Sequence, residues 1–139
     1  MQWTEVDFAN KLWVIPGERT KARKEHRVPL CDRAIQLLAQ RREYSTEAAV
    51  WSLTLKAIYR YLTKNVSVPV TVHGFRSSFR DWAGNETHFQ RVTCELALSH
   101  RAGDETETAY KRSTELKKRR KLMEAWASYC AGLTPLSND

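Results

Sequence analysis

Apolar and polar positions follow two different periods along the chain, and the change between them falls near residue 31. Before it, KLWVIP (11–16) and EHRVPL (25–30) are rich in β-prone residues and flank the polar, basic segment GERTKARK. Two β-prone runs joined by a polar connection are typical of an antiparallel hairpin. We therefore predict a basic β-hairpin over about residues 11–30.

From residue 32 onward, apolar residues recur at helical spacing, which predicts a helical core over about residues 32–130. The first helix begins with Asp32 as its N-cap. Later helices are predicted over about 52–62, 73–85, 90–99, 105–112 and 114–130, and a frayed tail over 131–139. The residues expected to form the apolar faces of the first two helices are Ala34, Ile35, Leu37, Leu38, Tyr44, Leu53, Leu55, Ile58, Tyr59 and Leu62.

The segment 73–85 has two contrasting edges. Apolar residues at i, i+4, i+7 and i+8 form one stripe that we expect to be buried. This stripe consists of Phe75, Phe79, Trp82 and Ala83. The opposite edge carries His73, Arg76 and Arg80. The pattern therefore predicts a helix that packs by one side and presents cationic groups on the other.

Length and composition limit the number of domains. The chain has 139 residues, of which 42% are hydrophobic, enough for one compact core. We therefore predict a single domain over residues 1–139. Its expected class is mainly α with a small antiparallel β-sheet (α+β), which the hairpin and the residues before it would form.

The charge balance indicates a polyanionic partner. Lysine and arginine number 23 against 16 acidic residues, a net charge of +7, which favours nucleic acid. The cysteines, Cys31, Cys94 and Cys130, indicate neither a disulfide framework nor a zinc site. No apolar run approaches the ~20 residues of a membrane span, and the first residues do not resemble a signal peptide. We expect a cytoplasmic protein associated with the bacterial nucleoid, with no membrane partner and no metal.

Three short segments carry residues suited to phosphodiester chemistry: HGFR (73–76), LALSH (96–100) and AGDETETAY (102–110). Metal-free cleavage of a phosphodiester needs cations on the non-bridging oxygens, a proton-transfer group and a nucleophile. Each residue also has an ordinary structural interpretation. His73 could cap its helix, Arg76 could form a surface ion pair, and Tyr110 could pack in the core.

In this order and at this spacing, HGFR, LALSH and ETAY resemble the catalytic signature of the tyrosine recombinases, the phage integrase family. The stretch AYKRSTELKKRRKLMEAWASYC (109–130) resembles the prophage integrase branch. Upstream, WTEVDF resembles the end of the family's first conserved box, and WVIPGERTKARKEHRVPL resembles its β-hairpin. The resemblance covers about residues 3–130 and implies the catalytic-domain fold of that family.

The resemblance implies a role for each catalytic residue. Tyr110 matches the nucleophile that attacks a DNA phosphate and forms a 3′-phosphotyrosyl link, so no cofactor is required. Arg76 matches an arginine that clamps the phosphate, and His73 matches the residue that exchanges the tyrosine proton. His100 matches a hydrogen-bond donor to the same phosphate. Lys21 matches the hairpin lysine that protonates the leaving 5′-oxygen, although Arg23 and Lys24 lie close enough in sequence to compete for this role.

The partner implied is double-stranded DNA at attachment sites, on which the protein would form a homo-oligomer. The residues expected to contact DNA are Arg23, Lys24, Arg80, Lys111 and Arg112. The basic run 117–121 fits either a solvated surface or a phosphate contact.

One part of the family pattern has no match. The family's first arginine would lie roughly nine residues upstream of Trp3. We therefore expect the chain to be an amino-terminally truncated catalytic fragment that is inactive alone. The alternative hypothesis is a non-catalytic DNA-binding or regulatory relic of an integrase.

Overall fold

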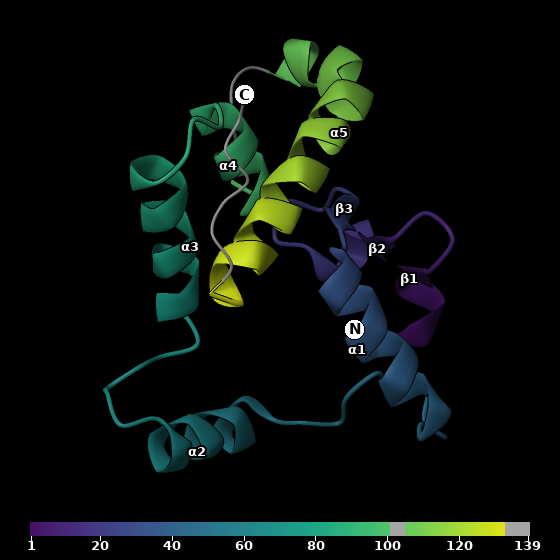
Figure 1. Cartoon of the computed structure of the whole chain (residues 1–139). Helices are drawn as coiled ribbons and strands as arrows, with labels where there is room; N and C mark the ends of the chain where they lie inside the picture. Colours follow the sequence, from purple (N-terminus) through teal and green to yellow (C-terminus); the bar gives the residue numbers. More distant parts are fainter. Residues whose placement is uncertain (101–104, 133–139) are drawn as a thin grey trace.

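The computed structural model of the chain describes residues 1–100 and 105–132, with side chains for 1–100 and 115–132 (Figure 1). The elements are two short 3-10 helices, η1 (Trp3–Glu5) and η2 (Gly17–Arg19), the strands β1 (Val6–Asp7), β2 (Leu12–Ile15) and β3 (His26–Pro29), and the helices α1 (Asp32–Glu43), α2 (Leu55–Asn65), α3 (Gly74–Asn85), α4 (Arg91–Ala97) and α5 (Glu105–Cys130). The described chain is thus mainly helical with a small antiparallel sheet, which confirms the predicted α+β class.

The predicted hairpin is confirmed as β2 and β3, and β1 adds a third antiparallel strand in the order β1-β2-β3. The connection between β2 and β3 folds back on itself. The Thr20 hydroxyl donates to the carbonyls of Gly17 (3.1 Å) and Lys24 (2.8 Å). A Cβ at Gly17 would lie 2.9 Å from the Arg23 carbonyl oxygen, so this close backbone approach requires glycine.

Helix α1 packs against the sheet around a small core of Leu30, Leu38 and Val50. The helix begins at Asp32 with Cys31 as its N-cap, so the prediction of Asp32 as the cap was wrong. The assignment of Leu37 and Tyr44 to the apolar face of this helix was also wrong, because these side chains are 44% and 80% exposed. Ala34, Ile35 and Leu38 share the face toward the sheet, whereas Leu37 points off that face and Tyr44 lies beyond the last turn.

A second core joins α3, α4 and α5. Its buried members are Phe79, Trp82, Ala83, Cys94, Leu98 and Leu122. Trp126 of α5 closes it, with its ring centroid 5.5 Å from Phe79 in an edge-to-face arrangement and 4.9 Å from Trp82. The predicted stripe of α3 is therefore confirmed at Phe79, Trp82 and Ala83. It is wrong at Phe75, which is 51% exposed because α4 and α5 meet α3 from Phe79 onward.

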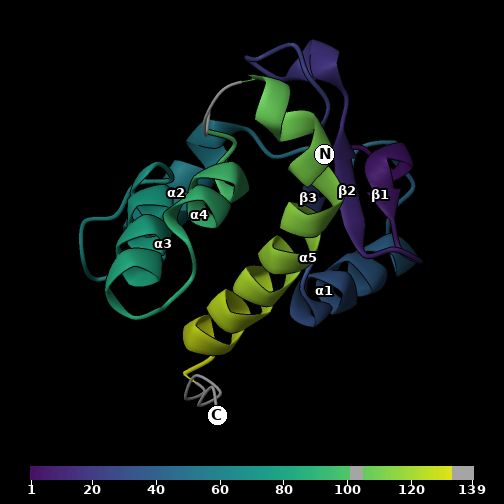
Figure 2. The same ribbon diagram turned by 90° about the horizontal axis from the view of Figure 1, so that it is seen from above.

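Helix α5 runs unbroken from Glu105 to Cys130, so the prediction of separate helices over 105–112 and 114–130 was wrong. No glycine or proline stands between those segments, and Ser113 and Thr114 are only weak helix formers. Figures 1 and 2 show α5 between the sheet on one side and α3 with α4 on the other. Two residues of the basic run connect it to the sheet region: Arg119 donates to the Arg27 carbonyl (2.8 Å) and Arg120 to the Asn10 carbonyl (2.5 Å).

Helix α2 lies apart from both cores, at the end of two extended segments (Figure 1). The predicted helix over about 52–62 is present, displaced to 55–65, and the Thr54 hydroxyl caps it by accepting from the Ala57 N–H (3.2 Å). None of its residues is buried. The spacing predicted an apolar face here, and three of its residues, Leu53, Leu55 and Tyr59, are more than half exposed. Within the described ranges, no helix has the length and apolarity needed to cross a membrane.

Candidate functional site

The start of α3 presents the HGFR segment at the protein surface. His73 is the N-cap residue, and its carbonyl accepts from the Arg76 N–H (3.0 Å). Just before it, the Thr71 hydroxyl accepts from the Gly74 N–H (2.9 Å) and so satisfies a donor that the first turn of a helix leaves unpaired. Because residues three apart in a helix lie on one face, His73 and Arg76 share the exposed edge that the sequence predicted.

The end of α4 brings His100 to the same edge. Ser99 has φ +58°, a left-handed conformation that turns the chain back on the helix. The His100 N–H then donates to the Glu95 carbonyl (2.9 Å). Arg76 Nη2 reaches across from α3, donating to the Leu98 carbonyl (2.7 Å) and lying 3.0 Å from His100 Nε2. Residues 24 positions apart in sequence are thus in direct contact.

Behind His100 lies Glu95, a mostly buried residue of α4 that contacts groups on two sides. One of its carboxylate oxygens accepts from Arg80 Nε (2.8 Å), and the other lies 2.6 Å from His100 Nδ1. The hydrogen bonds from His100 and then Arg80 lower the pKa of the Glu95 carboxyl below its usual value. Glu95 is therefore ionised at neutral pH and holds the side chains of Arg80 and His100 in place.

Together these side chains line an open pocket of about 230 Å³. Its lining residues are His73, Arg76, Ser77, Arg80, Asp81, Leu98 and His100. Two guanidinium groups and two imidazoles surround this small volume, and among the residues with described side chains Asp81 is the single acidic one in the lining. Such a concentration of donors and positive charge is suited to an oxyanion such as a phosphate group.

The predicted residues of the hairpin lie outside this pocket. Lys21, Arg23 and Lys24 are exposed in the connection between β2 and β3, and none of them lines the pocket. The backbone of Tyr110 belongs to α5, but the side chains of Tyr110, Lys111 and Arg112 lie outside the described residues. The structure therefore brings together His73, Arg76, Arg80 and His100.

Two residues near this pocket escaped the sequence analysis. Glu95 stands five positions before His100, and that spacing gave no signal of a contact. His26 of β3, which belongs to none of the catalytic motifs, is half-buried. Burial lowers the pKa of the His26 imidazole, and the positive charges of Arg119 and Arg76 lower it further. His26 therefore lies within the electrostatic reach of the candidate site.

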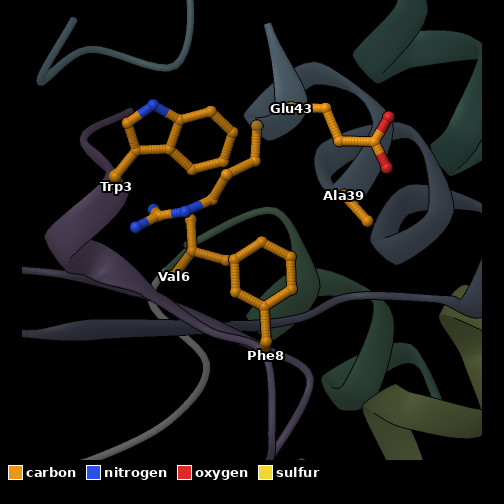
Figure 3. A pocket seen from close by; sticks show the side chains of 6 residues that line it. Trp3, Val6, Phe8, Ala39 and Glu43 are labelled. Carbon is orange, nitrogen blue, oxygen red and sulfur yellow. The ribbon is translucent and has the colours of Figure 1, made fainter. Parts of the chain in front are cut away.

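A second, larger pocket of about 510 Å³ lies between η1, β1 and α1 (Figure 3). Trp3, Val6, Phe8 and Ala39 give it apolar walls, and the Arg42 guanidinium lies 5.0 Å from the Trp3 ring centroid in a cation–π contact. Among the residues with described side chains, no group of three or more metal-binding side chains is arranged to hold an ion. None of the site residues predicted from the sequence lines the larger pocket, so the pocket at the start of α3 is the candidate site.

A surface pocket lined by two arginines and two histidines, in a basic α+β protein, is suited to binding an anion. Comparison with known proteins narrows the class of protein. The chain is 31% identical over 136 residues to the prophage integrase IntA of Escherichia coli K12, a match that covers 91% of this chain and 33% of the relative. The integrases of Enterobacteria phage P4 and Shigella phage Sf6 are 28% and 29% identical, over 92% and 93% of this chain and 35% and 36% of theirs.

The chain is therefore a homologue of the phage integrases, as the sequence motifs predicted. It spans about a third of the length of the relatives it matches. No protein-family model and no solved structure matches it.

Proposed function

We propose that this chain supplies the phosphate-binding part of a tyrosine-type site-specific recombinase, which integrates phage DNA by breaking and rejoining strands through a 3′-phosphotyrosyl intermediate. The observation that carries the proposal is the contact between Arg76 and His100 in the pocket that His73 also lines. The similarity to proteins named integrases supports DNA as the partner.

In this proposal the pocket receives one scissile phosphate. The planar guanidinium of Arg76 donates to its non-bridging oxygens and stabilises the charge that gathers on them in the transition state. His73, one helical turn away, exchanges a proton with the nucleophile, a task suited to an imidazole near neutral pH. His100 donates a further hydrogen bond to the same phosphate.

Two further groups complete the reaction. The Tyr110 phenol loses its proton and attacks phosphorus, and the bond to the 5′-oxygen breaks as that oxygen takes a proton from Lys21. The reaction conserves the phosphodiester energy in the protein–DNA bond, so neither a nucleotide nor a metal is required. Arg23, Lys24, Arg80, Lys111 and Arg112 are proposed to contact DNA phosphates, with a homo-oligomer assembled on the attachment sites.

A nicked attachment-site duplex tests the proposal, because the released 5′ fragment diffuses away before religation and the covalent adduct accumulates. The assay uses the full-length product of the gene, with adducts resolved by denaturing electrophoresis. We expect an adduct with the natural protein and none with Tyr110→Phe, which loses the nucleophile but keeps the ring. Arg76→Lys keeps the positive charge but loses the planar guanidinium that donates two parallel hydrogen bonds. It should slow adduct formation by roughly 100-fold or more with little change in DNA binding.

The general acid is assigned by a matched pair of variants. Lys21→Ala should be rescued by a substrate with sulfur at the 5′-bridging position, because a thiolate leaves without a proton. Rescue of Lys24→Ala instead would move the role to Lys24. An adduct that persists in Tyr110→Phe would contradict the mechanism, and salt-dependent binding with no adduct would favour a non-catalytic DNA-binding protein.

A further inference from the structure

Glu95 belongs to none of the motifs that resemble the integrase signature, yet it contacts one of their members directly. Its side chain is 20% exposed, and the carboxylate lies 2.6 Å from His100 Nδ1 and 2.8 Å from Arg80 Nε. Arg91, one turn earlier on α4, approaches the same carboxylate at 3.9 Å. Glu95 therefore connects α3, α4 and the segment that carries His100.

The contacts of His100 assign its protons. A guanidinium has only donors, so Nε2, which lies 3.0 Å from Arg76 Nη2, must accept. The ring hydrogen is then on Nδ1 and is donated to Glu95, whose carboxylate only accepts. In this arrangement His100 is a neutral imidazole, with its tautomer fixed by Glu95 on one side and Arg76 on the other.

The same contacts occupy Arg76. Nη2 carries two hydrogens, and the Leu98 carbonyl and His100 Nε2 use both. A guanidinium offers two planar forks, Nε with Nη2 and Nη1 with Nη2, and both forks include Nη2. Bidentate binding of a phosphate by Arg76 therefore requires Nη2 to leave at least one of its present partners.

We propose that Glu95 is the positioning residue of this pocket. By holding Nδ1–H of His100, Glu95 lets Nε2 change from accepting a hydrogen bond from Arg76 to donating one to a DNA phosphate. When Arg76 turns its fork to the phosphate, Nε2 loses its donor and faces an anionic oxygen. Nε2 then takes one proton from water or buffer acid and donates it in a hydrogen bond to that oxygen. Nδ1–H remains on Glu95 throughout, and the proton returns to solvent when the DNA leaves.

Some of the charged groups around the His100 ring oppose its protonation and others favour it. Arg76 and Arg80 on α3 and Arg91 on α4 oppose a cationic ring, as His73 at the N-cap of α3 does when it is protonated, whereas Glu95 and Asp81 favour a cationic ring. His26 on β3 lies within reach of the Arg76 charge. Among the described side chains, Glu95 is the acidic group in hydrogen-bonding contact with His100, so it offsets the surrounding positive charge most directly. The bound phosphate adds a second negative charge on the opposite side of the ring.

The proposal rests on the proposed function for the identity of the anion, and NMR of the histidine rings tests it without requiring strand cleavage. Long-range proton–nitrogen spectra distinguish the two neutral tautomers from the doubly protonated ring. In the natural chain near neutral pH we expect the Nδ1–H tautomer of His100, and protonation of both nitrogens on saturation with a short DNA duplex. Glu95→Gln should reduce the ratio of protonated to neutral His100 about tenfold in the complex, a change equivalent to one pH unit.

Two controls separate this effect from loss of structure. Glu95→Asp keeps the charge and should recover part of the protonation, whereas Glu86→Gln, which changes an exposed glutamate after α3, should behave as the natural chain. In the adduct assay, Glu95→Gln should slow adduct formation about tenfold at saturating DNA and leave the affinity for DNA within a factor of about three. The reason is that fewer complexes have the hydrogen bond from protonated His100 to the phosphate.

The outcomes separate this inference from the proposed function. A His100 ring that stays neutral in the complex, or protonates equally in Glu95→Gln, overturns the inference even if the natural protein forms the Tyr110 adduct. Protonation that depends on Glu95 in a protein that forms no adduct supports the inference and contradicts the recombinase mechanism.

Discussion

Helices α3 and α2 have nearly equal lengths, 12 and 11 residues, and each shows an apolar face in sequence. Their environments differ completely. Helix α3 buries Phe79, Trp82 and Ala83, whereas α2 buries no residue and leaves Leu55 73% exposed. Helical spacing produces an apolar face, but burial requires a neighbouring element. Among the described residues, α3 has such neighbours in α4 and α5, whereas no residue of α2 is buried.

This difference determines where each helix gains its stability. The aromatic rings of Phe79, Trp82 and Trp126 interlock, so α3 is stabilised by tertiary contacts and can hold His73 and Arg76 rigidly at its surface. Isolated helices of α2's length are marginal in water. The two helices therefore contribute differently to global stability, and the differences can be measured.

The largest expected effect is in α3. Trp82→Ala removes a side chain that is 5% exposed and leaves a cavity beside Trp126, so it should lower the free energy of unfolding by about 3–5 kcal/mol. Chemical denaturation measures this value. The matched change in α2, Leu55→Ala, should stay within about 0.5 kcal/mol, because Leu55 is already exposed. Equal losses in the two variants would show that α2 is packed in solution.

A smaller effect is expected from the contact between α5 and the sheet. Arg119 is 9% exposed and donates to the Arg27 carbonyl, so Arg119→Ala removes a charged hydrogen bond from a buried site. We expect a loss of roughly 2 kcal/mol in the free energy of unfolding. Lys117→Ala, an exposed neighbour in the same basic run, is the control and should change little. If both variants are neutral, α5 is not anchored to the sheet by this run.

Removing the cap of α2 should separate local from global stability. Thr54→Ala deletes the side-chain acceptor for the Ala57 N–H and should destabilise that helix by about 1 kcal/mol. Hydrogen exchange of the α2 amides should accelerate about fivefold, while exchange in α3 and the global unfolding free energy stay unchanged. A matching acceleration in α3 would contradict the independence of the two helices.

The smallest expected effect is a pH dependence of stability caused by His26, which lies on the same side of the molecule as the candidate site. The pKa of His26 is lower in the folded protein than in the unfolded chain, because of burial and the charges of Arg119 and Arg76. The neutral ring therefore contributes stability above the unfolded pKa of ~6.5, and this contribution is lost as pH falls through the folded pKa. Natural protein should lose more stability on acidification below that value than His26→Gln. Parallel pH profiles for the two proteins would contradict the His26 assignment.

Local patterns were sufficient to predict much of the fold. The hairpin, the start of α3 at HGFR and the burial of Phe79, Trp82 and Ala83 follow from period, β-propensity and apolar spacing. The α5 region was only partly predicted, because separate helices were expected over 105–112 and 114–130 where the structure has one continuous helix. The motif residues His73, Arg76 and His100 were also identifiable in sequence, through their resemblance to the integrase signature.

The sequence by itself thus determined which segments are helix or strand and which side chains carry reactive groups, because these depend on neighbours within a few positions. Long-range packing determined which apolar faces are covered, and so Phe75 and α2 stay exposed while Trp82 does not. It also placed Glu95 on the His100 ring, His26 within reach of the Arg76 charge, and Arg119 in the interface with β3. These contacts depend on how separate elements pack against one another, and the pattern of residues within one element does not determine that packing.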